Sequence, residues 1–370
     1  MASFGMQPIK GFSEFSELSR KYSIPLSEIV QIDFNRMGIY LPNNEIKANF
    51  RVRFKGSILD GDNSWFALPV REVSGSYFRA VASKIYFGER EIGKFEELML
   101  DTCESSYQRG PQLLNLNSRS RSTCGGCTAC VHNYKNLYDD TVIKDRQVLI
   151  TADDVRNFLF THKINVPSLK QIAIVTGLFG SEEHAVEHIG LVHSVVKEFG
   201  FSGELMYFGC EINSRWAIRR LAEIDNFLLI YALDNFTKRE RLLAKTKSRV
   251  TLDDARNVLT YARNLGLKTT IAYIAGIDPL EEMRAGFCRI LDSLSHFPII
   301  NIYQVQTPGQ AKIFDPEATN LEYFLKSRIM IEEMFKSTTM RPKRWENYRP
   351  LWYGYFQDRR LPANSYGENE

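Results

Sequence analysis

The segment from Gln171 to Gly209, QIAIVTGLFGSEEHAVEHIGLVHSVVKEFGFSGELMYFG, decides the fold class of this chain. It begins with a short apolar run, continues with a helical pattern from about Glu182 to Gly200, and ends with a second apolar run from Glu204. Short apolar runs separated by a helical stretch are typical of a β-α-β unit. The segment therefore predicts two parallel strands joined by a helix, with a glycine just beyond the end of that helix.

The same alternation repeats along the middle of the chain. Thr151 and Thr251 each stand three residues before an aspartate, which resembles a capping box and marks two further helix starts. Repeated strand–helix alternation predicts an α/β fold with a parallel sheet. Periodicity leaves an open doubly wound sheet and a barrel as alternatives, and both place the chemistry at the carboxyl ends of the strands. The six candidate strands are Leu113–Leu116, Gln171–Val175, Glu204–Phe208, Phe227–Tyr231, Thr269–Ile274 and Ile299–Tyr303.

The flanking regions have different patterns, so we predict three regions. Residues 1–108 begin with a helical pattern over Phe12–Ile29 and continue with short strand-like segments, which predicts a small β-rich α+β domain. Residues 109–312 hold the α/β unit, and residues 313–370 hold a helix around Leu321–Lys336 and an aromatic, basic tail. The N-terminal candidate strands are Phe50–Phe54, Trp65–Val70, Tyr77–Val81 and Lys84–Phe87.

Composition excludes several classes of protein. The chain has 370 residues, of which 44% are hydrophobic and 25% charged, as in ordinary soluble globular proteins. Lys+Arg exceeds Asp+Glu by 47 − 44 = 3, which is too small to indicate bulk binding to nucleic acid, DNA included. No apolar run approaches the roughly 18 residues of a membrane span, and no signal-peptide pattern is present. We therefore expect a cytoplasmic protein with no membrane partner.

Three of the six cysteines are clustered, as Cys124-Gly-Gly-Cys127-Thr-Ala-Cys130, after the first candidate strand. Thiolates at two-residue gaps are ligands that a soft metal or an iron–sulfur cluster selects. Tyr134 stands where a ferredoxin-type run has its fourth cysteine, so that closed run is absent. A [4Fe–4S] cluster held by three thiolates is the preferred interpretation. A zinc site with His132 as fourth ligand and a loop without metal are the alternatives.

A strand that leads into a cysteine triplet, ahead of repeated β/α units, resembles the radical S-adenosylmethionine superfamily. The resemblance covers roughly residues 110–310 and has two departures, a first gap of two residues instead of three and Ala129 in place of an aromatic. It implies a partial (β/α)6 barrel and a [4Fe–4S] cluster on the three cysteines. It also implies an enzyme that reductively cleaves S-adenosylmethionine to a 5′-deoxyadenosyl radical, which abstracts hydrogen from an organic substrate.

The resemblance extends to segments at the ends of later strands. The second strand leads into an element similar to the Gly-Gly-Glu element that meets the methionine amino group. The fourth strand leads into a polar and basic segment of the kind that meets the ribose and carboxylate, and the fifth leads into a glycine element beside the adenine. The residues that these elements imply for cofactor binding, together with the acid after the third strand, are Thr176, Gly177, Glu182, Glu211, Asp234, Arg239, Arg241 and Gly276.

The remaining cysteines have separate interpretations. Cys210 follows the third candidate strand, and we predict a catalytic role as a hydrogen-atom donor or radical relay, with a buried apolar thiol as the alternative. Glu211 could also be a simple helix-cap acid. Cys103 is expected to be structural, and Cys288 is expected in the core side of an amphipathic helix over Glu281–Leu294.

Two further patterns have unremarkable explanations. His184 and His188 have the i, i+4 spacing of a metal pair, but a solvated helix face explains them. Aromatic and basic residues alternate between Arg341 and Arg360, which suits either RNA stacking or a tail that closes one end of the barrel. Two alternative functions therefore stay open, a zinc-stabilised RNA-binding module and an iron–sulfur electron-transfer or scaffold protein. For the enzyme we expect a small metabolite as substrate, ahead of peptide or RNA, and an electron donor such as flavodoxin or ferredoxin.

Overall fold

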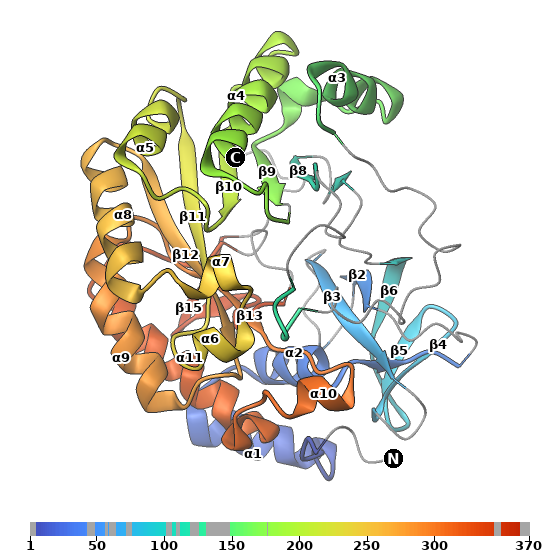
Figure 1. The fold of residues 1–370 in the computed structure, drawn as a ribbon. Helices are drawn as coiled ribbons and strands as arrows, with labels where there is room; N and C mark the ends of the chain where they lie inside the picture. The colour runs from blue at the N-terminus through green and yellow to red at the C-terminus, as the bar shows by residue number, and fades with distance from the viewer. Residues whose placement is uncertain are drawn as a thin grey trace.

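A computed structural model describes residues 5–42, 49–55, 58, 64–71, 76–100, 106–108, 112–118, 126–130, 149–175, 177–343 and 349–362 (Figure 1). Its centre is a seven-stranded sheet in the order β13-β12-β11-β10-β9-β8-β7, curled into a half-barrel. A separate six-stranded barrel is formed by the N-terminal part of the chain. Within the described ranges, no helix combines the length and the apolar character needed to cross a bilayer.

The six strands predicted for the α/β region are all present. Each pairs in parallel with the next along the chain, and the short β7 (Tyr107–Gln108) pairs antiparallel with β8. Strand order therefore follows chain order without the reversal that defines a doubly wound sheet, which decides between the two predicted alternatives. The strands are β8 (Leu113–Leu116), β9 (Gln171–Val175), β10 (Glu204–Gly209), β11 (Phe227–Asp234), β12 (Lys268–Ala275) and β13 (Ile299–Ile302).

Helices alternate with these strands, and Figure 1 shows α4, α5, α8 and α9 along one face of the sheet. Both predicted capping boxes are confirmed, since Thr151 and Thr251 each accept the N–H of the aspartate three residues on. Gly200 (φ 82°) and Gly266 (φ 88°) follow α4 and α8 in the left-handed region that ends a helix. The longer helices are α3 (Ala152–Thr161), α4 (Glu182–Glu198), α5 (Arg215–Leu221), α8 (Leu252–Asn264), α9 (Leu280–Ile290) and α11 (Leu321–Phe335).

Short elements connect or follow these units. Among them, α6 and α7 lie between β11 and α8, and α10 follows β13, so all three belong to loops at the carboxyl edge of the sheet. The short elements are η4 (Val166–Ser168), α6 (Arg239–Leu242), α7 (Lys245–Ser248), η5 (Leu291–Ser293), α10 (Pro308–Ala311), η6 (Pro316–Thr319), β14 (Tyr355–Phe356) and β15 (Arg359–Arg360).

The helical pattern predicted over Phe12–Ile29 forms two helices, so the prediction of one helix was wrong. The helices are α1 (Phe12–Tyr22) and α2 (Leu26–Met37). Ser23 lies in the left-handed region at φ 55°, and Pro25 lacks the N–H that a continuing helix needs. Helix α2 is buried along most of its length, where it contacts α11, β13 and β3. The N-terminal helices therefore pack directly against the α/β unit.

The β-rich part of the N-terminal region is a closed barrel in the order β1-β3-β2-β6-β5-β4. All four strands predicted there are present, and β1 and β6 were missed. Arg71, at the end of β3, connects the barrel to the rest of the protein, because its Nε donates to Met37 O at the end of α2 (2.9 Å) and its guanidinium also bonds Val305 O beyond β13. The strands are β1 (Ile39–Tyr40), β2 (Asn49–Lys55), β3 (Ser64–Arg71), β4 (Phe78–Val81), β5 (Lys84–Phe87) and β6 (Arg90–Leu100).

The aromatic tail packs into the protein. Trp352 and Phe356 are buried, with ring centroids 5.1 and 5.5 Å from Phe297, and Trp352 Nε1 donates to Glu332 (2.8 Å). Rings buried in this way cannot stack on bases, which favours the interpretation of the tail as a closing segment. Trp345 and Tyr348 lie outside the described residues.

Candidate functional site

The turn that carries two of the clustered cysteines lies at the carboxyl edge of the half-barrel. Within Gly126–Cys130, the Thr128 N–H donates to Leu242 O (2.8 Å), and Ala129 O accepts from Gln310 Nε2 (3.3 Å). Leu242 lies in the connection after β11, and Gln310 lies in the connection after β13. The turn is therefore held between two loops that follow strands of the sheet, as sequence order alone predicted for a catalytic edge.

Cys127 and Cys130 belong to one tight turn, closed by a hydrogen bond from the Cys130 N–H to Cys127 O (2.9 Å). Both side chains are half-buried, and Cys127 Sγ accepts the backbone N–H of Ala244 at 3.3 Å. Burial raises the pKa of the Cys127 thiol to about 11, and the positive charge of Lys247 lowers it. Cys124 lies outside the described residues, so its place relative to this turn stays a prediction.

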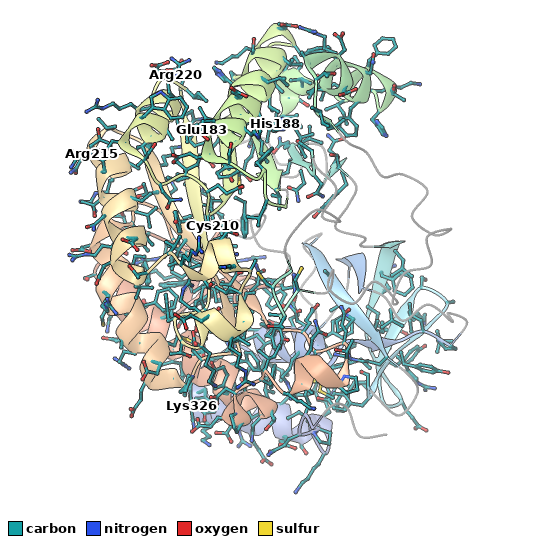
Figure 2. The ribbon with its side chains drawn as sticks, viewed as in Figure 1. Glu183, His188, Cys210, Arg215, Arg220 and Lys326 are labelled. Carbon is teal, nitrogen blue, oxygen red and sulfur yellow. The ribbon has the colours of Figure 1, made fainter. Side chains whose placement is uncertain are left out.

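Cys210 lies directly after β10 and is buried in the interior (Figure 2). Its carbonyl accepts from Tyr231 Oη (3.3 Å) and Asn213 Nδ2 (3.1 Å), which fixes the backbone at this point. Burial raises the pKa of the Cys210 thiol to about 11, Lys247 lowers it, and charge on Cys127 raises it further. Cys127 thus lies near enough to Cys210 to affect the pKa of its thiol.

An ion pair lies next to these sulfurs. Asp234, at the end of β11 with φ 66°, pairs with Lys247 of α7, and their side chains are 17% and 13% exposed. Burial lowers the pKa of Lys247 and Asp234 raises it, with a net upward shift that keeps the ammonium charged. Asp234 was predicted as a cofactor contact; Lys247 was missed, because it stands in a polar run that is typical of a solvated loop.

The Arg239 side chain fixes the same loop by hydrogen bonds to its backbone carbonyls. Its Nη1 donates to Leu233 O (2.6 Å) and Asn235 O (2.7 Å), and its Nη2 donates to Lys247 O (3.0 Å). Its buried Nε has no hydrogen-bond partner among the described residues. Burial lowers the pKa of Arg239, and Asp234 opposes that shift.

Glu211 fixes the loop that follows β9. One carboxylate oxygen accepts the N–H groups of Phe179 (2.7 Å) and Gly180 (3.1 Å), and the other accepts from Tyr207 Oη (3.1 Å). Gly177 belongs to this loop, and Thr176 lies outside the described residues. The carboxylate is therefore engaged in holding backbone that was predicted to face the cofactor.

Glu182 makes the reciprocal connection. It begins α4, and its Oε1 accepts the N–H groups of Asn213 and Ser214 (2.7 Å to Ser214) at the start of α5. Ser214 in turn caps α5 by accepting the N–H of Ala217 (3.1 Å). The segments after β9 and β10 are thus joined in both directions by half-buried carboxylates.

Asp278 performs the same task for the loop after β11, and the sequence analysis assigned it no role. It is fully buried, and its carboxylate accepts from the N–H groups of Phe236 (2.7 Å) and Thr237 (2.9 Å) and from Tyr273 Oη (2.8 Å). Two residues earlier, Gly276 has φ 116° at the end of β12. In the sequence, the signal that could have indicated this role is an apolar strand that ends in a glycine and is followed closely by a single acid.

Other connections at this edge also escaped the sequence analysis. Gln310 is buried, caps α10 through a Thr307–Gln310 capping box, and then reaches Ala129 in the cysteine turn. The spacing of Thr307 and Gln310 was a visible capping signal. The contact with Ala129, 181 residues away, could not be anticipated from spacing.

The structure brings some of the predicted site residues together and leaves others apart. Those brought together around the α6–α7 loop are Cys127, Cys130, Cys210, Asp234 and Arg239. Gly276 lies against Tyr303, while Arg241 is exposed. Within the described ranges, no three His, Cys, Asp or Glu side chains converge as a metal site, and these ranges exclude Cys124 and His132.

Two minor expectations can be checked. Cys288 is exposed, so its predicted core position was wrong. It does not lie on the buried face of α9, which is formed by Met283, Gly286, Phe287 and Ile290. His188 is buried beside Phe179 (centroids 5.1 Å apart) while His184 is exposed. The histidine pair is therefore split between the core side and the solvent side of α4.

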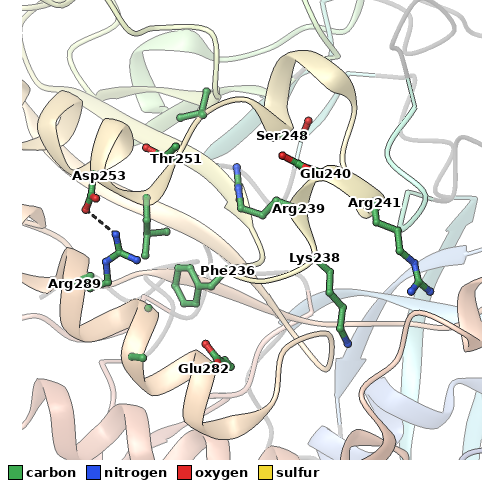
Figure 3. Close-up of a pocket in the computed structure, with 14 residues that line it drawn as sticks. Phe236, Lys238, Arg239, Glu240, Arg241, Ser248, Thr251, Asp253, Glu282 and Arg289 are labelled. Carbon is green, nitrogen blue, oxygen red and sulfur yellow. Dashed lines mark hydrogen bonds and ion pairs between the residues drawn. The ribbon is translucent and has the colours of Figure 1, made fainter.

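A cleft of about 750 Å³ lies beside the connection that follows β11 (Figure 3). Phe236 forms part of its floor, stacked on Tyr273 at 4.7 Å, and Lys238 and Arg241 extend from the α6 side. Arg239 and Arg241 are shared with the predicted site, but none of the residues that line the cleft is a cysteine. The cleft and the cysteine turn thus both adjoin the connection that follows β11.

No family model and no curated protein matches this chain. Among solved structures, SuiB from Streptococcus suis bound to S-adenosylmethionine aligns with a TM-score of 0.38 and 13% identity, over 55% of this chain and 43% of SuiB. SuiB bound to the precursor peptide SuiA aligns with a TM-score of 0.37 and 13% identity, over 52% of this chain and 39% of SuiB. The chain therefore spans less than half the length of either SuiB chain. S-adenosylmethionine and the precursor peptide are ligands of SuiB.

Proposed function

We propose that this chain is a radical S-adenosylmethionine enzyme in which Cys124, Cys127 and Cys130 hold a [4Fe–4S] cluster. One observation carries the proposal: the turn with Cys127 and Cys130 is bonded to the loops after β11 and β13, at the carboxyl edge of a curled parallel sheet. Ligands and catalytic groups of α/β barrels gather at this edge. The zinc-module alternative has no comparable reason to place its cysteines there.

The described residues fit an anionic thiolate-bound cluster. The donors are soft sulfurs, Cys127 Sγ already accepts a backbone N–H, and the buried cation of Lys247 lies nearby. Metal coordination deprotonates thiols, so it overcomes the burial that raises the pKa of Cys127. When bound, the cluster and S-adenosylmethionine supply the reductive cleavage that begins hydrogen abstraction. The cofactor carries that chemistry, and the protein supplies orientation and shielding.

The chain's own residues would orient and shield the reaction. Arg239 and Asp278 fix the loop after β11, and Glu211 fixes the loop after β9. The concave face of the sheet offers a separate apolar cluster that excludes water: Ala173, Met206, Leu228, Ile230, Ala232, Ala272 and Ile299. Thr176, Gly177, Asp234, Arg241 and Gly276 complete the proposed surroundings of S-adenosylmethionine.

Cys210 is proposed as the catalytic hydrogen-atom donor. Burial raises its pKa to about 11, so the thiol keeps its hydrogen at neutral pH. Its position directly after β10 is supported by two hydrogen bonds to its carbonyl. The proposed substrate is an organic molecule, with a small metabolite as first choice, and the proposed electron donor is a protein of the flavodoxin or ferredoxin type.

The test is anaerobic reconstitution with iron and sulfide, followed by incubation with S-adenosylmethionine and dithionite. Iron, zinc and 5′-deoxyadenosine are measured for the wild type, Cys127→Ser and the exposed control Cys288→Ser. We expect about four irons and cleavage in the wild type and the control, and loss of both in Cys127→Ser. One zinc, no iron and no cleavage would overturn the proposal; cluster without cleavage would indicate an electron-transfer or scaffold protein.

A further inference from the structure

A buried positive charge lies beside the cysteine turn. Lys247 is one helical turn after Ala244, whose N–H donates to Cys127 Sγ at 3.3 Å. The Lys247 side chain is only 13% exposed and forms an ion pair with Asp234, which is 17% exposed. An ammonium group is costly to bury unless negative charge surrounds it. A second source of negative charge, such as thiolates bound to a metal cluster, would therefore favour this arrangement.

The ion pair and the Cys127 sulfur are linked through one short turn of backbone. The Lys247 N–H donates to Ala244 O at 2.9 Å, and the Ala244 N–H donates to Cys127 Sγ at 3.3 Å. Asp234 joins the same region through its ion pair with Lys247. The two members of the pair carry opposite charges, so they exert opposite electrostatic effects on a group bound at this sulfur.

The position of this charge is fixed by the backbone. Arg239 Nη2 donates to Lys247 O at 3.0 Å, while Arg239 Nη1 holds the carbonyls of Leu233 and Asn235. Lys245 begins the same short helix but is exposed to solvent. Of these two lysines, only Lys247 is held inside the protein, and Lys245 offers a matched control for a change of net charge.

We propose that Lys247 is a positioning residue whose buried charge raises the reduction potential of the iron–sulfur cluster at the cysteine turn, and that Asp234 opposes it. This inference rests on the proposed function. Cluster potentials depend on net charge, hydrogen bonds to sulfur and burial. Reduction adds one negative charge, which a nearby cation stabilises and a nearby anion destabilises. Removing each partner should consequently shift the potential in opposite directions.

The test is a redox titration of the reconstituted protein, followed by the electron paramagnetic resonance signal of the reduced cluster. We expect Lys247→Met to lower the potential and Asp234→Asn to raise it, each by at least a tenfold change in the one-electron equilibrium, which is about 59 mV. Lys247→Arg keeps the charge and should restore a potential near that of the wild type. Lys245→Met should leave the potential unchanged, because an exposed charge is screened.

The signs of the shifts distinguish this proposal from a structural role. If both substitutions shift the potential in the same direction, or neither shifts it while the cluster is bound, the inference is overturned and the proposed function stands. If the wild type itself binds no cluster, both are overturned. If Lys247→Met fails to retain iron, the upward shift in Asp234→Asn supports the inference and its absence overturns it.

Discussion

Replacing Asp278 with alanine should weaken the protein at the loop that supports the cysteine turn. The buried carboxylate accepts hydrogen bonds from the N–H groups of Phe236 and Thr237 at 2.7 and 2.9 Å, and from the hydroxyls of Thr237 and Tyr273 at 2.5 and 2.8 Å. Hydrogen bonds to a charged group contribute about 1.5–3 kcal/mol each. Water can replace the carboxylate at the half-buried amides, so the sum is not lost in full. We expect a loss of about 3–5 kcal/mol in the free energy of unfolding.

Urea denaturation measures this loss as a lower midpoint. The matched control is Asp253→Ala, since Asp253 pairs with Arg289 at 2.8 Å on the surface, where the side chains are 69% and 55% exposed. Such a pair contributes less than about 1 kcal/mol. Asp278→Asn keeps one acceptor oxygen and should fall between the two. Equal midpoints for Asp278→Ala and Asp253→Ala would refute the assignment of Asp278 as a clamp.

Three further predictions test other parts of the structure by the same denaturation measurement. Gly286→Ala should destabilise the protein by about 1–3 kcal/mol, because the added Cβ would overlap a neighbouring aromatic ring. In Gly190→Ala the added Cβ meets nothing within 4 Å, so this substitution should stabilise the protein by about 0.8–1 kcal/mol. Changes of the same sign in both variants would contradict this reasoning. Burial lowers the pKa of His296 to about 4 from 6.5, so the unfolded state binds the extra proton and stability should fall as pH falls from 6.5 towards 4. His296→Gln should make the free energy of unfolding fall less steeply between pH 6.5 and pH 4. An unchanged dependence on pH would contradict the role given to His296. Arg328→Met leaves Glu28 buried without its ion-pair partner and should cost about 3–5 kcal/mol; a change below about 1 kcal/mol would be inconsistent with the ion pair.

The sequence predicted the α/β part of the fold well because its signals are local. Each of the six strands is a short apolar run, helices α3 and α8 begin at threonine caps, and helices α4 and α8 end near a glycine. Strand β6 (Arg90–Leu100) was missed because its charged residues hide the alternation expected of a strand. The break at Ser23 was missed because a left-handed serine leaves no mark in the hydrophobic pattern. Strand order, which distinguishes a half-barrel from a doubly wound sheet, depends on pairing across the chain and has no local signal.

The site was predicted in part, for a related reason. The cysteine spacing indicated the turn, and strand ends indicated Cys210 and Asp234 as its neighbours. The cofactor contact of Glu211 stays a prediction; its observed hydrogen bonds, to two backbone N–H groups 31 and 32 residues away and to Tyr207 Oη, had no signal in the sequence. Lys247 was not predicted, because a lysine is ordinarily exposed and burial of its charge depends on Asp234 across the loop. Residue type and spacing therefore indicate which residues lie at the carboxyl edge of the sheet, but not which hydrogen bonds and ion pairs they form there.

The acids at this edge of the sheet have a different task from the one proposed for the cysteines. Glu182, Glu211 and Asp278 each use their carboxylates to hold N–H groups of the loop that follows a neighbouring strand. Adjacent loops are thus braced against one another by carboxylates that accept backbone N–H groups. Cys127 differs in its chemistry, because its side chain ends in a sulfur, which accepts the Ala244 N–H and is the type of ligand that a soft metal selects. Under the proposed function, these braced loops would hold the cysteine turn in a fixed position for a thiolate-bound cofactor.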